Sequence, residues 1–459
     1  MMKRTSRALR QSLRGALLSS VVGLVLCGPA AATSMEDAIR LALQHSPDIG
    51  NVAHNREAIQ QELRQARGLY LPQLDIAAGI GKERTNDRNT RADVNNRDAL
   101  TLTRQESSLT IQQRIFDGFE SDSSVEREKA RIRSAALRVY ENAEFTALDA
   151  ISAYMTVMRE RELVRLAEEN VQVHQVILGF LQEQLAGGAG SGADVSQAEA
   201  RLARSRATLT DQFNRLRDAE AGYARVVGQY PDEMDQSDFP VGSLPIDLEA
   251  AIEGVWRNNP TYHIFDADVR TAEAEVDLAE APLYPAITLE GESEYNVNRD
   301  GIEDYEFNNQ IMLRMRWNLY RGGIDSAARQ EAVSRVSQSK AIRQGALLQA
   351  EEEMRNSWHA LDASRRQIDE FTTTVNYSLE TRDAYRQQFE VGQRTLLDVL
   401  DSENELFTSK GQLATAKTNE QLASYRILAL GGLLLKTLSI EAPEQASLEI
   451  PTFGEQLFD

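Results

Sequence analysis

Hydrophobic residues along this chain recur with two periods, and the same order of periods occurs twice. From Glu36 to Leu69 they recur every three to four residues, which predicts helix with a break near Pro47, where the proline ring disturbs the preceding turn. The period then changes to two, which predicts a strand pair over about residues 73–116. After Asp117 the helical period returns. Each half of the chain therefore predicts a helix, a β-hairpin, a very long helix and a further helix.

The hairpin expected in the second half, over about residues 286–319, has the clearest alternation. Ile287, Leu289 and Tyr295 alternate with charged or polar residues, so each strand has one apolar and one strongly polar face. The charged residues that we expect on the polar face are Glu290, Glu292, Glu294, Arg314 and Arg316.

A proline-free helical pattern follows this hairpin from about Ser326 to Val391, and only Gly345 interrupts it. About 65 residues at 1.5 Å each would give a helix of roughly 100 Å. Ordinary globular helices have about 8–20 residues, so this length favours coiled-coil-like packing against neighbouring helices.

Landmarks shared by the two halves indicate a duplicated unit. Pro47 recurs as Pro260 at an offset of 213, and Asp194 recurs as Asp398 at an offset of 204. Repeats of this kind define the organisation of a fold. We therefore expect a first repeat over 33–230, a polar linker over 231–247, a second repeat over 248–440 and a C-terminal tail over 441–459.

The N-terminus has the order of a secretory signal peptide. Five basic residues and no acidic residue precede an apolar stretch from Ala16 to Cys27, and three alanines at 30–32 supply the small residues of a cleavage site. Residues 1–32 are therefore expected to be removed. The only cysteine is lost with them, so the exported chain is expected to carry no disulfide.

Composition argues against several classes of function. Fifty Lys and Arg against 70 Asp and Glu give a net charge of -20, and removal of the five basic residues of the leader deepens it to -25. Such a polyanion repels nucleic acid, so we expect no nucleic-acid partner. The five histidines are scattered, and no HExxH, GxSxG or Cys–His pattern occurs. We therefore expect no enzymatic activity, no metal and no cofactor.

Beyond residue 32 no apolar run approaches the ~18–20 residues of a membrane helix. Amphipathic strands can also span a membrane. The strands could form a soluble sandwich, or a barrel whose apolar face contacts lipid and whose polar face lines a wet lumen. The helices are too long to cover so small a sheet, and the signal peptide also favours the barrel. Four strands cannot close a barrel, and an open edge is not tolerated in lipid, so two, three or four copies would be required.

Glycine-rich turns at 187–192 and 391–394 separate the expected antiparallel helices. A phosphate-binding loop would need a preceding strand and a following Lys-Ser/Thr, and neither is present. Ser191 with Asp194, and Thr395 with Asp398, have the spacing with which each pair can cap the returning helix. The tip residues that we single out are Gly188, Ser191, Gly192, Gly392 and Thr395.

Charged residues close to the second turn suggest a constriction. In a symmetric oligomer, Arg394, Asp398 and Asp401 would each form a ring of charges. Carboxylate rings favour cations, and Arg–Asp hydrogen bonds between neighbouring copies can hold a constriction shut.

Four segments resemble the TolC family of outer-membrane channel proteins: SMEDAIRLALQHSPDI, YLPQLDI, RIFDGF and VGQRTLLDVLDSENEL. The resemblance runs from Ser34 to about Leu438. It implies a homotrimer with a twelve-stranded β-barrel in the outer membrane, continuing into a long α-helical barrel across the periplasm. The fold class expected is therefore mainly α with a transmembrane β section.

The same resemblance implies a periplasmic gate that contains Arg394, Asp398, Asp401 and Asp194. Phe389 stands where the best-known members have a gate tyrosine, so the hydrogen bond of that tyrosine cannot form in this chain. The gate is therefore only partly supported by the family pattern.

The resemblance further implies a periplasmic adaptor, which docks on the helical tips, and an inner-membrane transporter. The stretch QESSLTIQQRIFDGFESDSSVEREKARIRSA resembles the branch that serves type I secretion of large adhesins, in which an ABC transporter supplies the energy. One alternative is the outer-membrane component of a tripartite pump for small toxic molecules. A second alternative is a periplasmic coiled-coil scaffold with a soluble β-domain.

Overall fold

The computed structural model describes residues 33–88, 90, 99–235, 243–452 and 454. The expected signal peptide lies outside the described residues, as do parts of the expected linker (236–242) and tail (453 and 455–459).

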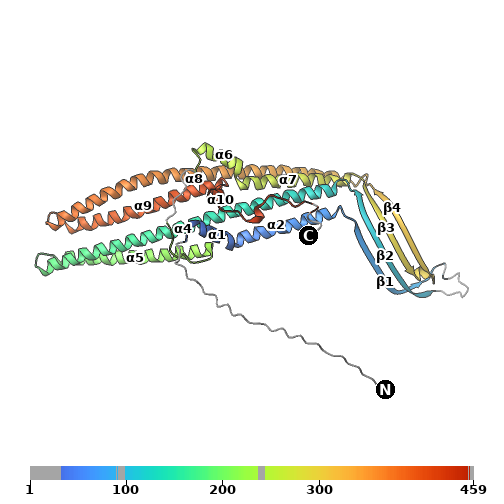
Figure 1. Ribbon diagram of the computed structural model, residues 1–459, viewed down its shortest axis with the longest axis horizontal. Coiled ribbons are helices and arrows are strands. Elements are labelled where there is room, and N and C mark those ends of the chain that lie inside the picture. The colour runs from blue at the N-terminus through green and yellow to red at the C-terminus, as the bar shows by residue number, and fades with distance from the viewer. Residues whose placement is uncertain (1–32, 89, 91–98, 236–242, 453, 455–459) are drawn as a thin grey trace, which may run out of the picture.

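The elements form two similar series (Figure 1). The first is α1 (Met35–His45), α2 (Pro47–Gly68), β1 (Gln73–Thr85), β2 (Leu100–Phe116), α4 (Glu120–Ala186) and α5 (Gly192–Val227). The second is α6 (Leu248–Asn258), α7 (Pro260–Glu280), β3 (Ala286–Val297), β4 (Tyr305–Arg316), α8 (Ile324–Glu390) and α9 (Leu396–Leu430), followed by α10 (Leu434–Thr437). The predicted duplicated order of helix, hairpin, long helix and helix is confirmed.

The two longest helices set the length of the molecule. α4 and α8 have 67 residues each, which at 1.5 Å per residue is about 100 Å. Each forms an antiparallel pair with the helix that follows it, α4 with α5 and α8 with α9, and the two pairs lie side by side (Figure 1). Among the helices of the described residues, none is both long enough and apolar enough to cross a membrane.

At the predicted break near Pro47, α1 ends and α2 begins with an N-cap. The Ser46 hydroxyl accepts a hydrogen bond from the Ile49 N–H (3.4 Å), and Pro47 occupies the first turn of α2, where its missing N–H costs nothing. In the second repeat Asn259 plays the same part, accepting from the Tyr262 N–H (2.9 Å) before α7. The repeats therefore build the same break from Ser-Pro and from Asn-Pro.

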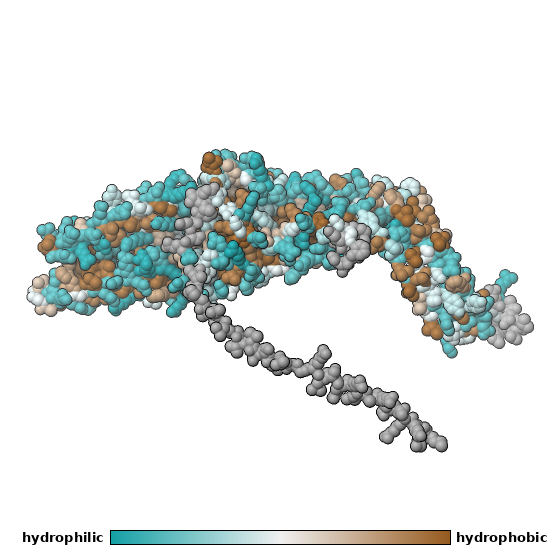
Figure 2. Space-filling model, in the orientation of Figure 1, coloured by the Kyte–Doolittle hydropathy of each residue, from teal (hydrophilic) through white to brown (hydrophobic). Residues whose placement is uncertain are grey.

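The four strands form one antiparallel sheet in the order β1-β2-β3-β4, so β2 and β3 join the two hairpins. No other strand of the described residues pairs with the outer edge of β1 or of β4. One face is apolar and exposed: Ile76, Ile311 and Leu313 are 78%, 82% and 68% accessible. Figure 2 shows hydrophobic side chains gathered over this sheet. A single chain therefore leaves both the edges and the apolar face uncovered.

Sharp turns connect the strands to the long helices. Gly118 and Phe119 precede α4, and Gly322 and Gly323 precede α8, and all four have positive φ. A Cβ at Gly118 would lie 2.5 Å from the Ala281 carbonyl oxygen, so this position requires glycine. Phe119 tolerates the left-handed conformation while its ring packs edge-on against the rings of Phe116 and Tyr284, with centroids 5.3 and 5.9 Å away.

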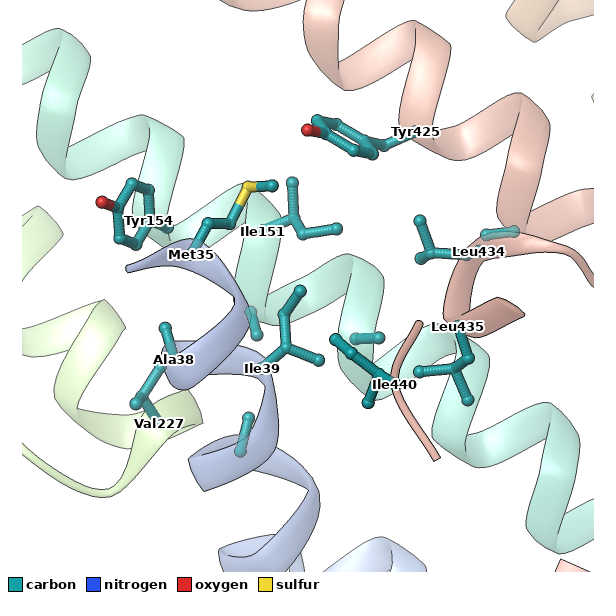
Figure 3. Close-up of a cluster of buried hydrophobic side chains, with 14 of the residues drawn as sticks. Met35, Ala38, Ile39, Ile151, Tyr154, Val227, Tyr425, Leu434, Leu435 and Ile440 are labelled. Atoms are coloured by element: carbon teal, nitrogen blue, oxygen red, sulfur yellow. The ribbon is translucent and has the colours of Figure 1, made fainter. Parts of the chain in front are cut away.

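The main core lies midway along the helices, where α1, α4, α5, α9 and α10 meet (Figure 3). Alanines on α4 let the helices approach closely, and larger side chains from the other elements fill the centre. The labelled members in Figure 3 include Met35, Ile39, Ile151, Tyr154, Val227, Tyr425, Leu434, Leu435 and Ile440.

One carboxylate is sealed inside this core. Glu144 of α4 is fully buried, and its two oxygens accept the N–H groups of Leu434 (3.0 Å) and Leu435 (3.3 Å) at the start of α10. Burial raises the pKa of Glu144 to about 7, and the two backbone hydrogen bonds only partly oppose this effect. Glu144 thereby anchors the C-terminal segment to α4. Above neutral pH this carboxylate is ionised inside the core, which lowers the stability of the fold.

We predict that Glu144→Gln becomes more stable than the wild type as pH rises. The folded-state pKa lies above the ordinary value of 4.5, so the protonated form's contribution is complete below pH 4.5 and is lost as pH rises through 7. Between low pH and pH 8 the variant should gain up to roughly 3 kcal/mol relative to the wild type. This gain adds to a loss that does not depend on pH, because Gln has one acceptor oxygen for the two N–H groups. Thermal unfolding followed by circular dichroism at pH 5 and pH 8 measures the difference.

Glu168→Gln is the matched control, because Glu168 is exposed on the same helix. Its stability relative to the wild type should not depend on pH. Parallel curves for the two variants would contradict the anchor described for Glu144.

Candidate functional site: the helical tips and the polar face of the sheet

Both helical pairs turn at the end of the molecule that is farthest from the sheet (Figure 1). Gly188 and Gly392 have φ values of +80° and +75°, which favour glycine. A Cβ at Gly190 would lie 2.7 Å from the Leu185 nitrogen, so that turn also requires a glycine. A Cβ at Gly192 would meet no atom within 4 Å, so packing within one chain does not require this glycine.

The second tip has the reciprocal cap expected from its sequence. The Thr395 hydroxyl accepts from the Asp398 N–H (3.3 Å), while the Asp398 carboxylate accepts from the N–H (3.3 Å) and the hydroxyl (2.8 Å) of Thr395. The bond from the Thr395 hydroxyl is the main cause that lowers the pKa of Asp398. This carboxylate therefore has a structural role within its own helix.

The first tip differs from the expectation of an equivalent pair. The Ser191 hydroxyl accepts from the Ala193 N–H (3.2 Å), one residue earlier than a capping box requires. The Asp194 carboxylate makes no reciprocal bond to Ser191 within the described part of the chain. Ser191 therefore caps α5 without a reciprocal bond from Asp194.

Arg394 is held by its own helical pair. Its guanidinium lies 4.1 Å from the centre of the Tyr385 ring, its Nε donates to Gln388 Oε1 (2.9 Å), and its Nη1 is 3.8 Å from the Asp398 carboxylate. Tyr385, one turn before Phe389 on α8, was not singled out from the sequence. The sequence signal that could have identified Tyr385 is its position four residues before Phe389, a gate candidate on the same helix.

Phe389 belongs to the small core of the tips. Its ring lies 6.0 Å from that of Phe180 on α4, and it packs against a buried cluster contributed by α4, α5 and α9. The buried members are Leu181, Ala198, Leu396 and Leu400. In place of the hydrogen bond of a tyrosine, this position therefore supplies an aromatic contact between the two helical pairs.

Two ion pairs join the helical pairs above this core. Arg201 of α5 bonds to Asp401 of α9 at 3.0 Å, and Lys410 of α9 bonds to Glu169 of α4 at 2.9 Å. Beside Arg201 lies the buried His174, whose pKa is lowered by burial and then by the Arg201 charge. Arg201 was not singled out either, because its partner is 200 residues away in the sequence.

The structure thus brings only some of the gate candidates together. Arg394 and Asp398 are neighbours, whereas Asp401 points to α5 and Phe389 lies in the tip core. In the described residues, Asp194 bonds to none of these four. No three His, Cys, Asp or Glu side chains of the described chain are placed to hold a metal ion.

The strand register places the expected charged residues on one face of the sheet. Glu290, Glu292 and Glu294 lie on the face opposite Leu289 and Tyr295 of β3, and β4 adds Arg314 and Arg316 to the glutamate face. Ion pairs and hydrogen bonds run across it, from Arg314 to Glu290, from Gln310 to Glu292, and from Arg299 to Glu294 (3.1 Å). A continuous polar face opposite an apolar one is the pattern of a barrel wall.

The fold is that of bacterial outer-membrane channel proteins. The outer membrane protein VceC of Vibrio cholerae matches with a TM-score of 0.73 and 20% sequence identity, over 86% of this chain and 96% of that chain. The family described as "Outer membrane efflux protein" matches residues 38–229 and 255–433, which is most of the chain. This chain belongs to that family, and the resemblance to TolC-family channels is confirmed.

Two relatives of differing names match along nearly the whole length. "Outer membrane efflux protein BepC" of Brucella suis biovar 1 is 24% identical over 93% of this chain and 91% of its own. "Proteases secretion protein PrtF" of Dickeya chrysanthemi is 24% identical over 88% and 89%. The protein is therefore an outer-membrane channel protein, and its helical part extends into the periplasm.

We predict that Thr395→Ala loosens the start of α9. Loss of an N-cap costs about 1 kcal/mol, so the first amides of α9 should exchange with solvent about fivefold faster. Hydrogen exchange read by mass spectrometry on peptides from the tip measures this. Thr408→Ala is the control, because the Thr408 hydroxyl only bonds back to the Asn404 carbonyl within α9 (2.8 Å); equal exchange in both variants would refute the cap.

If the ion pair between Arg201 and Asp401 helps to hold the tips together, Arg201→Ala will raise the single-channel conductance in planar bilayers. The pair is partly exposed, with side-chain accessibilities of 28% and 59%, so its loss should cost only about 0.5 kcal/mol per chain. Arg204→Ala removes the same charge from an exposed position on α5 and should leave conductance unchanged.

Asp401→Ala should have the same effect as Arg201→Ala, and the double variant should add little to either one, because the two residues share a single interaction. Unchanged conductance in both Asp401→Ala and Arg394→Ala would exclude these residues from a gate.

Proposed function

We propose that this protein is the outer-membrane duct of a type I secretion system and that three copies close a twelve-stranded barrel. The observation that carries the duct is the sheet: its strands of 13, 17, 12 and 12 residues are long enough for a tilted membrane crossing. The sheet has one apolar face, one charged face and two free edges. In lipid those edges must be paired, and further copies of the chain supply the strands.

The proposed cargo is a protein, such as a large adhesin or an RTX-type protein. Two observations support protein export: the similarity along most of both chains to PrtF, whose name assigns it to protease secretion, and the segment 105–135, from β2 into α4, that resembles the adhesin-exporting branch. An inner-membrane ABC transporter would supply the energy, as the resemblance to the type I secretion branch implies.

The helical tips are the proposed docking surface for a periplasmic adaptor. They lie about 100 Å from the sheet along the helices. The glycines at their turns add no side chains to the surface of the tips. The proposed docking residues are Gly188, Ser191, Gly192, Gly392 and Thr395. The residues proposed to narrow the duct there are Arg394, Asp398, Asp401, Asp194 and Phe389.

A second candidate keeps the duct but assigns it to a tripartite efflux pump for small toxic molecules. The similarity to BepC, named as an efflux protein, favours this candidate. Both candidates share the barrel, the helical tunnel and the tips, and they differ in cargo and in the inner-membrane partner.

We predict that the protein fractionates with the outer membrane as a detergent-stable oligomer whose mobility on gels shifts after heating. Barrels closed by several chains resist detergent until the strands separate, which explains the expected shift. Recovery of the whole protein from the soluble periplasm would instead support the scaffold alternative.

Deletion of the gene separates the two duct candidates. For secretion, we expect loss of one or a few large proteins from the culture medium, with unchanged resistance to dyes and detergents. Increased sensitivity to such compounds with a normal set of secreted proteins would favour efflux. Complementation with Arg204→Ala, a surface variant outside the sites described, controls for expression.

A further inference from the structure

The strand register sorts the charges of the polar face by distance from the helices. Thr288 of β3 pairs with Arg114 of β2 on one side and with Arg314 of β4 on the other. Arg316, two residues further along β4, pairs with Ala286 at the end of the sheet that joins the helices. Since neighbouring strands are about 5 Å apart, the three arginines form one basic zone, named here the arginine zone.

The next four rows away from the helices carry charges of the opposite sign only. Each row contains at least one carboxylate, and no Lys or Arg of the described strands falls in them. The carboxylates are Asp75, Glu106, Glu290, Glu292, Glu294 and Glu306. The sign of the wall charge therefore reverses within two residues of the arginine zone.

Two of the three arginines already have acidic partners. Arg314 is paired with Glu290, and Arg114 is paired with Glu120 (3.3 Å) and Asp117 (3.7 Å). Arg316 is exposed and has no side-chain hydrogen bond or ion pair to another described residue. Among the described residues of one chain, it is the guanidinium of this zone that has no acidic partner.

The backbone that carries Arg316 is held firmly. The indole Nε1 of Trp317, the next residue, donates to the Leu283 carbonyl (3.1 Å) in the short turn between α7 and β3. Tyr284, which follows that turn, packs against Phe119 at the start of α4. Arg316 therefore has a fixed position at the junction of strands and helices.

We propose that Arg316 is an oxyanion-binding residue at the end of the barrel that joins the helices. There it binds carboxylate groups of the cargo as they pass from the helical tunnel. This rests on the proposed function, in which three copies close the barrel and the polar face lines its lumen. A guanidinium stays charged at every physiological pH and bonds a carboxylate with two parallel N–H groups. Three copies supply three such groups at one level, as in anion-selective pores.

The carboxylate rows beyond Arg316 limit how strongly an anion is held there. Glu290, Glu294 and Glu106 are paired with Arg314, Arg299 and Arg104, whereas Asp75, Glu292 and Glu306 have no cationic partner among the described residues. An acidic group bound at the arginine zone faces repulsion from these three unpaired carboxylates, so binding at Arg316 lowers the entry barrier without creating a deep trap. Acidic side chains of a polypeptide and small organic acids share this chemistry, and the experiment distinguishes them.

The test uses the purified oligomer in planar bilayers. In a KCl gradient, Arg316→Ala removes one charge from each of three copies and should shift the reversal potential toward cation preference by about eightfold in permeability ratio, or roughly twofold for each unit charge about 10 Å from the path in water. Arg84→Ala is the matched control: Arg84 is exposed on β1, on the same face as Ile76 and Ile80, and should leave the potential unchanged.

Oxyanion binding itself is read from block of the KCl current. Citrate added on the helical side should reduce the wild-type current, and Arg316→Ala should abolish that block. Arg316→Lys should keep the reversal potential of the wild type and weaken the block, because an ammonium lacks the two-pronged geometry. Block by a glutamate-rich peptide as well as citrate assigns the residue to polypeptide cargo, and block by citrate alone assigns it to small acids.

An Arg316→Ala channel with the reversal potential and citrate block of the wild type would overturn the proposal. Failure of the wild-type oligomer to conduct at all would instead overturn the proposed duct, so the two failures are distinguishable. Gel mobility before and after heating shows that each variant assembles.

Discussion

Backbone hydrogen bonding at strand edges in a medium without water is the constraint on which this structure depends. The edges of β1 and β4 present unpaired N–H and C=O groups, and the same sheet exposes an apolar face that water does not favour. Both costs disappear when strands of further copies complete a closed wall in lipid. In the proposed duct the chain is therefore one part of an assembly, and the duplication of hairpin and long helix matches the symmetry that such a wall needs.

The other end of the molecule follows a different physical rule. The helical tips are joined by a small apolar cluster and by partly exposed ion pairs, each worth little on its own. The deep core, with Glu144 and its bonds to α10, lies midway along the helices. Stability is thus concentrated at the middle, and the tips are the part of the described chain in which rearrangement costs least.

Local patterns predicted much of the fold and some of the candidate site. The period-two segments became β1 to β4, the proline at position 47 became the first residue of a capped helix, and Thr395 with Asp398 formed the reciprocal cap. Each of these features depends on residues within a few positions of one another. The pair of Ser191 and Asp194 has the same spacing, yet its hydroxyl bonds one residue earlier, because the turn geometry differs between the tips.

By itself, the sequence determined the order of elements, the two faces of each strand and the resemblance to an outer-membrane channel family, because alternation, helical periodicity and motifs are local. Only the tertiary structure decided that Arg201 meets Asp401 and that Phe389 packs on Phe180. The same holds for Arg316, which has no acidic partner among the described residues and lies beside two arginines that do. These partners come from elements far apart in the chain. Their contacts follow from how the two repeats pack and from the register between strands, which a single sequence does not encode locally.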